Sequence, residues 1–117
     1  MSGTTSYHAG RVAEDQVAQL YGGSGRPIVA RRWRGTAGEI DLIARDGAEV
    51  IFIEVKKSKT HAMAAEHLTD RQMARIYQTA AEFIGGEPGG QDTLMRFDVA
   101  LVDQIGRIEI LQNAFAA

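Results

Sequence analysis

The feature that most limits the fold is a short apolar run in the middle of the chain, at residues 49–56. Between Val50 and Val55 the only charged residue is Glu54; the others are Ile51, Phe52 and Ile53. A short apolar run rich in β-branched residues is typical of a central strand that is covered on both faces. Asp46-Gly47 precedes it as a hairpin signal, so residues 38–45 are predicted to form the neighbouring antiparallel strand.

The remaining elements follow from the spacing of apolar residues. A helix is predicted over residues 7–21, and a second helix between a capping box at Thr69-x-x-Gln72 and the glycines at 85–86. Short strands are predicted at 28–34, 95–102 and 107–111. Along residues 38–45 simple alternation puts Ile40, Leu42 and Ala44 on one face and Glu39, Asp41 and Ile43 on the other. The order predicts an α/β domain with a mixed central sheet flanked by helices.

Length and composition bound the class of protein. The 117 residues suit a single domain over 1–117, and we expect residues 1–6 to be flexible. No apolar run is long enough for a membrane span, and the chain has no cysteine for disulfides or thiolate metal sites. With no leader recognisable, we expect a cytoplasmic protein without a membrane partner.

The net charge of −2 argues at first against a nucleic-acid partner. The charge is unevenly placed, however. Residues 1–34 and 56–75 are each basic on balance, residues 35–55 between them are acidic, and residues 76–117 carry the remaining acidic excess. One interpretation is solvated faces of mixed sign. The other is an acidic, metal-binding centre flanked by a surface that binds phosphates.

The charges next to the apolar run suggest chemistry. Glu54 and Lys56 lie two residues apart on one strand and point to the same face. The hairpin brings Asp41 near Glu54, where two carboxylates could share a magnesium ion. Such a centre would hydrolyse phosphodiesters, with Lys56 assisting the attacking water. The alternative is that Lys56 simply pairs with a carboxylate at a strand end. Glu14 flanks the apolar stripe of the first helix, and its pattern favours an ordinary solvated residue.

The blocks Gly38-Glu39-Ile40-Asp41-Leu42-Ile43 and Phe52-Ile53-Glu54-Val55-Lys56 resemble those of the YraN family. These are small bacterial proteins related to restriction-endonuclease-like nucleases, the PD-(D/E)xK superfamily, and to Holliday-junction resolvases. The resemblance implies a restriction-endonuclease-like three-layer fold. It also implies Mg²⁺ or Mn²⁺ as cofactor, held by Asp41, Glu54, Glu14 and the backbone carbonyl of Val55. Lys56 would be the catalytic lysine, with Asp41, Glu54 and Glu14 completing the catalytic set.

Basic residues beside these blocks are the candidates for nucleic-acid contacts: Arg31, Arg32, Arg34, Lys57, Lys59, Arg71 and Arg75, together with Gln72. Trp33, which lies between Arg32 and Arg34, is equally compatible with stacking on a base and with a place in the core. The leading hypothesis is a metal-dependent endonuclease acting on DNA, such as branched or damaged DNA, and analogy with junction-cutting enzymes suggests a homodimer. The alternatives are a nucleic-acid-binding module of the same fold without significant nuclease activity, and a small interaction protein.

Overall fold

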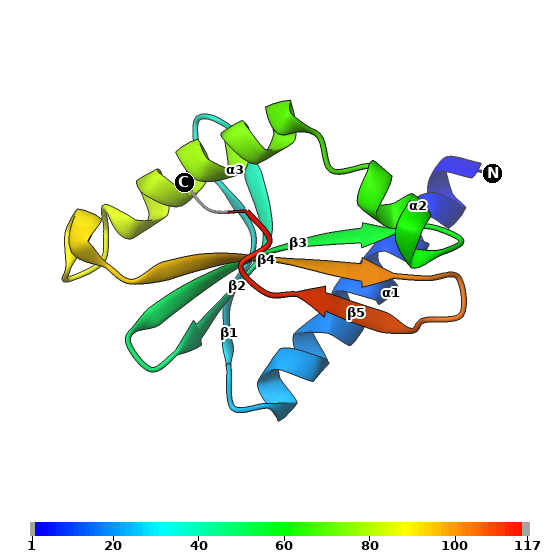
Figure 1. The fold of residues 1–117 in the computed structure, drawn as a ribbon, viewed down its shortest axis with the longest axis horizontal. Coiled ribbons are helices and arrows are strands. Elements are labelled where there is room, and N and C mark those ends of the chain that lie inside the picture. The colour runs from blue at the N-terminus through cyan, green and yellow to red at the C-terminus, as the bar shows by residue number, and fades with distance from the viewer. Residues whose placement is uncertain (1, 116–117) are drawn as a thin grey trace.

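The computed structural model describes residues 2–115, with side chains described from residue 10 onward. Its elements are α1 (Ser2–Gly23), β1 (Ile28–Arg34), β2 (Glu39–Asp46), β3 (Glu49–Lys57), α2 (His61–Glu66), α3 (Asp70–Ile84), the 3₁₀ turn η1 (Gly90–Asp92), β4 (Met95–Val102) and β5 (Ile108–Leu111). The strands form one sheet in the order β1-β2-β3-β4-β5, in which β3 and β4 are parallel and the other neighbours antiparallel. This confirms the mixed α/β architecture with β3 at the centre (Figure 1).

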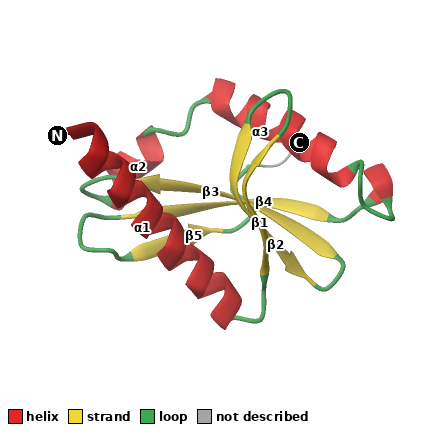
Figure 2. Cartoon of the chain, turned by 180° about the vertical axis from the view of Figure 1, so that it is seen from behind, coloured by secondary structure: helices red, strands yellow, loops and turns green. Residues whose placement is uncertain are grey.

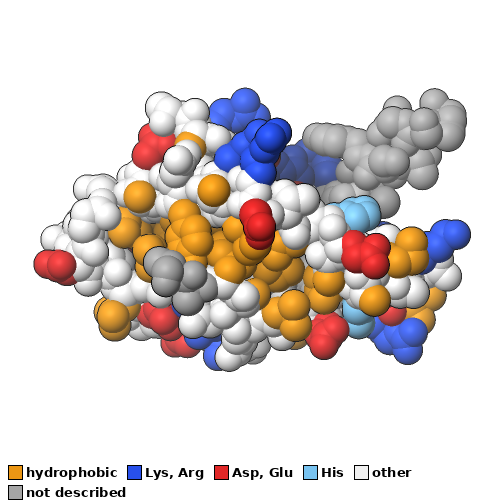
Figure 3. All heavy atoms as spheres, turned by 45° about the horizontal axis from the view of Figure 1, so that its top comes forward, with side chains coloured by type: hydrophobic (Ala, Val, Ile, Leu, Met, Phe, Trp, Pro, Cys, Tyr) orange, Lys and Arg blue, Asp and Glu red, His pale blue; other side chains and the backbone are white. Residues whose placement is uncertain are grey.

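Helices cover both faces of the sheet, as the apolar run of β3 predicted. Helix α1 packs on one face through Ala13, Val17 and Tyr21, against Ile51 and Ile53 of β3. Helix α3 packs on the other face, where its apolar residues meet Val50 and Phe52. Figure 2 shows α1 crossing the sheet on its own side, with α3 on the opposite side. On the α3 side, Figure 3 shows a band of hydrophobic side chains at the surface.

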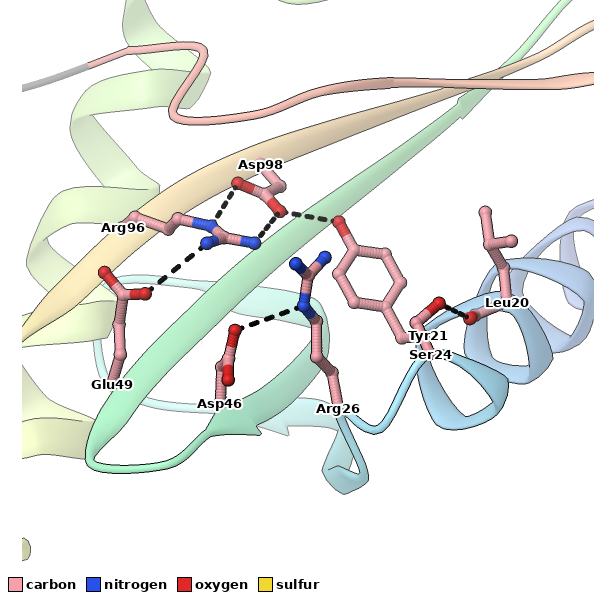
Figure 4. A network of polar contacts seen from close by, with 8 residues as sticks. All are labelled: Leu20, Tyr21, Ser24, Arg26, Asp46, Glu49, Arg96 and Asp98. Atoms are coloured by element: carbon pink, nitrogen blue, oxygen red, sulfur yellow. Dashed lines mark hydrogen bonds and ion pairs between the residues drawn. The ribbon is translucent and has the colours of Figure 1, made fainter.

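Helix α1 is tied to the sheet by a buried polar network (Figure 4). The hydroxyl of Tyr21 donates a hydrogen bond of 2.7 Å to Asp98, which is fully buried on β4. Arg96 pairs with the same carboxylate at 3.0 Å, and the backbone N–H of Asn113 donates to it at 2.9 Å. These contacts join Asp98 to α1, to its own strand and to the turn after β5, so its carboxylate has a structural role.

The observed elements differ from the predicted ones in three places. Helix α1 begins at Ser2 rather than residue 7; the predicted flexibility of residues 1–6 stays a prediction, and Met1 lies outside the described residues. Helix α2, which was not predicted, has only six residues, too few to show a helical period. The largest difference is in β2, where Ile40 packs on the α3 side together with Ile43, while Leu42 packs on the α1 side. The predicted alternation is therefore confirmed for Leu42, Ile43 and Ala44 and is wrong for Ile40, on the other side of Asp41.

No helix in the described part of the chain is both long and apolar enough to cross a membrane.

Candidate functional site

The predicted site residues come together at one end of the sheet. The β2–β3 register pairs Leu42 with Ile53, so Asp41 and Glu54 are the next residues on their two strands. They line a cavity of about 610 Å³ with Glu14 from α1, and with Val55 and Lys56 from β3. The hairpin therefore brings Asp41 and Glu54 to one place, and the spacing of Glu54 and Lys56 puts both at the same cavity.

Glu54 is the most buried charged residue of this cavity, with only 7% of its surface exposed. Its Oε2 accepts a hydrogen bond from Gln72 Nε2 at 2.8 Å and lies 3.3 Å from Lys56 Nζ. Its Oε1 is buried and has no hydrogen-bond donor among the described residues. A buried carboxylate oxygen without a donor is unusual in a folded protein, because its lost hydration is not replaced.

The electrostatics of the two carboxyls reflect this crowding. Burial, and next the neighbouring Asp41 carboxylate, raise the pKa of Glu54 to about 8, against the opposing pull of Lys56. Burial also raises the pKa of Asp41, and the Glu14 carboxylate adds to the effect. The N–H of Val55 opposes the rise by donating a hydrogen bond of 2.8 Å to Asp41 Oδ2. Strongly perturbed carboxyls that share a cavity are a recurring property of functional sites.

Glu14 reaches the same cavity from α1 but has a partner of its own. Arg32 donates to its Oε1 twice, from Nε at 3.0 Å and from Nη2 at 2.8 Å. Both side chains are largely shielded, with 17% of Glu14 and 31% of Arg32 exposed. Glu14 is thus not the ordinary solvated residue that its helix position favoured. Its contact with Arg32 is closer than any contact that it makes with Asp41 or Glu54.

The predicted basic residues divide into two groups. Residues of β1 are paired with nearby acids: Arg31 with Asp15 at 2.6 Å and Arg34 with Glu39 at 3.3 Å. By contrast, the described part of the chain gives no hydrogen bond or ion pair to the side chains of Lys57, Lys59, Arg71 and Arg75. Trp33 packs edge-on against Phe83 at 5.3 Å between ring centroids, so it belongs to the core rather than to a stacking surface.

Gln72 takes a different role from the one its sequence position suggested. It was predicted as a nucleic-acid contact and as the closing residue of a capping box. The N-cap half is confirmed, since Thr69 accepts from the Gln72 N–H at 3.2 Å. The Gln72 side chain instead holds Glu54. The sequence also gave no signal for His67, Ser58 and Gln104, which line the same cavity from distant segments.

Fold and site together define the class of protein: a mixed α/β domain with two buried carboxyls and a lysine at one end of its sheet. Residues 13–102 match the model of the uncharacterised protein family UPF0102, and the chain belongs to this family. A UPF0102 protein of Cereibacter sphaeroides is 68% identical over the full length of both chains. UPF0102 proteins of Ruegeria pomeroyi and Roseobacter denitrificans are 58% and 48% identical, over 97% and 98% of this chain and 92% and 89% of their own.

Proposed function

We propose that this protein is a metal-dependent endonuclease of the restriction-endonuclease-like superfamily, to which the YraN-type motifs point, and that it cleaves phosphodiester bonds of DNA. The observation that carries the proposal is the Asp41–Glu54 pair. Two carboxyls of adjacent strands lie in one cavity with raised pKa values, and a lysine lies 3.3 Å from one of them. A site meant only for stability has no need to bury two acids side by side.

The donor set fits Mg²⁺ or Mn²⁺. Such hard cations take oxygen ligands and are often held by one or two carboxylates, with water and phosphate oxygens completing the shell. Asp41 and the donor-free Oε1 of Glu54 offer oxygens of this kind. The Val55 carbonyl and Glu14 are the further ligands that the family resemblance implies. A bound cation would lower the pKa of a water and offset charge that develops on the phosphoryl group.

The protein's own residues have distinct tasks in this proposal. Lys56 Nζ, 16% exposed at the cavity wall, is placed to orient the attacking water or to stabilise negative charge at phosphorus. Gln72 and Lys56 both hold Glu54 through Oε2, which leaves Oε1 as its oxygen without a donor. Fixing a reacting carboxylate in one orientation is how an active site lowers the entropy cost of the transition state.

The substrate surface lies on the side of the cavity that carries the cations without acidic partners. Lys57 lines the cavity, and Lys59 and Arg71 follow in the neighbouring segments. Cations without an internal partner are available to replace counterions on the DNA backbone. The arginines of β1 are already neutralised by Asp15, Glu14 and Glu39, so we assign them a smaller share of phosphate binding.

A cleavage assay tests the proposal. Supercoiled plasmid and four-way-junction DNA are incubated with protein and Mg²⁺ or Mn²⁺. The wild type should nick at least one substrate, whereas Asp41→Ala and Lys56→Ala should not. Glu39→Ala is the matched control, because Glu39 lies on the same strand as Asp41 but is exposed and paired with Arg34. Equal behaviour of all four proteins on every substrate would refute the nuclease assignment.

The second candidate function is a nucleic-acid-binding module with the same fold and no significant turnover. One observation favours it: in the described residues no group of three His, Cys, Asp or Glu is arranged to hold a metal ion. In that case binding should weaken steeply with salt, should depend on Lys57 and Lys59, and should be indifferent to Asp41→Ala and to divalent cations.

A further inference from the structure

Arg32 has a backbone conformation that its residue type rarely adopts. Its φ of +49° lies in the left-handed region, although it sits within β1. This region costs a non-glycine residue free energy, and such strain persists where surrounding contacts enforce it, often at functional sites. Contacts of Arg32 with the surrounding structure are therefore expected to compensate for this strain.

The strain coincides with a reversal of both strands at the candidate site. On β1, Arg31 reaches Asp15 of α1, whereas Trp33, two residues later, packs on the α3 side. On β2 the same change separates Leu42 from Ile40. The register pairs Arg31 with Leu42 and Trp33 with Ile40, so Arg32 and Asp41 occupy the positions between these two pairs. Both residues thus lie where the sheet reverses its faces.

The reversal lets Arg32 reach Glu14 from the edge strand. Its guanidinium makes two hydrogen bonds to one oxygen, Oε1, and the pair is largely shielded from solvent. Glu14 in turn bears on the pKa of Asp41. The cavity is lined by three carboxylates, of Glu14, Asp41 and Glu54, and by the cations Lys56 and Lys57, while Arg32 pairs with Glu14 from outside this lining. Without a bound metal these cations limit the mutual repulsion of the acids.

We propose that Arg32 is a positioning residue of the metal site: it holds Glu14 at the edge of the cavity and balances its charge until a divalent cation binds. The inference rests on the proposed function. It differs from the sequence-based prediction, in which Arg32 contacts nucleic acid. A cation entering the site competes with the guanidinium for Glu14, so removal of the guanidinium should strengthen metal binding.

Arg32→Asn is the informative variant, because Asn tolerates a positive φ better than most residues. Arg31→Asn is its matched control, since it removes the same charge from the adjacent residue, whose partner Asp15 is exposed. Affinity for Mn²⁺ is measured by titration calorimetry on DNA-free protein, with thermal unfolding to confirm that each variant is folded. If Arg32→Asn does not fold, Arg32→Gly replaces it, because Gly accepts the same backbone angle.

We expect Arg32→Asn to bind Mn²⁺ about tenfold more tightly than the wild type, and Arg31→Asn to stay within about twofold. In a Glu14→Gln background the effect of Arg32→Asn should fall below about threefold, because the competition for Glu14 is gone.

Unchanged affinity for Mn²⁺ with a lowered unfolding temperature would show that Arg32 has a purely structural role, and would overturn the inference. Equal effects of the two Asn variants, or a loss of DNA affinity as the only change, would also overturn it. If the wild type binds no Mn²⁺ at Asp41, both this inference and the proposed function fail; if it binds and Arg32→Asn matches it, only this inference fails.

Discussion

Replacing Glu54 with Gln should stabilise the metal-free protein while abolishing the proposed cleavage of DNA. Gln is isosteric with Glu, so its amide oxygen can still accept from Gln72 and Lys56. Its amide nitrogen then takes the place of Oε1, which has no donor among the described residues, and can donate to the Asp41 carboxylate. The substitution thus removes a buried charge beside a like charge and adds a hydrogen bond.

The magnitude follows from the raised pKa. With the pKa of Glu54 raised from 4.5 to about 8, ionisation opposes folding. The stability that protonated Glu54 contributes to the folded state is fully present below pH 4.5 and is lost as the pH rises toward 8. Each pH unit in this window costs about 1.4 kcal/mol at most. Because Lys56 loses its charged partner in the variant, we expect a net gain of roughly 1–3 kcal/mol at pH 8 and little gain at pH 5.

Urea unfolding at pH 5, 6.5 and 8, in the presence of a chelator, measures this difference. The wild type should lose stability across the range, while Glu54→Gln should lose much less. Glu39→Gln is the control: it removes an exposed carboxylate of β2 and should leave the pH dependence as in the wild type. A Glu54→Gln variant that is less stable than the wild type at pH 8 would refute the account of the site as a place of electrostatic strain.

Three further predictions follow from contacts elsewhere. Tyr21→Phe should lower the free energy of unfolding by about 1–2 kcal/mol in thermal or urea melts, because it removes the hydroxyl that donates to buried Asp98; a neutral effect would show that water replaces that donor. Thr69→Ala should cost about 1 kcal/mol in the same melts by removing the N-cap of α3, and no cost would mean that the helix end is held otherwise. Lys59→Ala should weaken DNA binding and reduce its salt dependence more than Arg31→Ala, since Arg31 already pairs with Asp15; the reverse order, by fluorescence anisotropy at several salt concentrations, would place the DNA on the β1 side.

Local sequence signals predicted the centre of the fold well. The apolar run of β3, the Asp46-Gly47 turn and the helix stop at Gly85 each depend on neighbouring residues alone, and the structure confirms all three. The approach of Asp41 to Glu54 could also be predicted, because a tight hairpin fixes the register of its strands.

Features that depend on distant segments could not be predicted. The reversal at Arg32 and Asp41 coincides with the contact between Arg32 and Glu14 of α1, which no alternation pattern encodes. The helix signal at Thr69-x-x-Gln72 is local. The hydrogen bond from the Gln72 side chain to Glu54, in place of one to its own helix end, depends on tertiary structure. The ion pairs of the β1 arginines also depend on tertiary structure. The sequence suggested that these arginines were available to bind phosphates, whereas in the fold they are paired with acids.

The central claim is that the Asp41–Glu54 site cleaves DNA with a divalent metal. The most direct measurement is nicking of supercoiled and junction DNA with Mn²⁺ by wild type and Glu54→Gln, prepared identically. Because the variant is expected to be the more stable protein, lost activity cannot be attributed to unfolding. We predict cleavage by the wild type and none by Glu54→Gln. Cleavage by both at the same rate, or by neither on any substrate, would contradict the account.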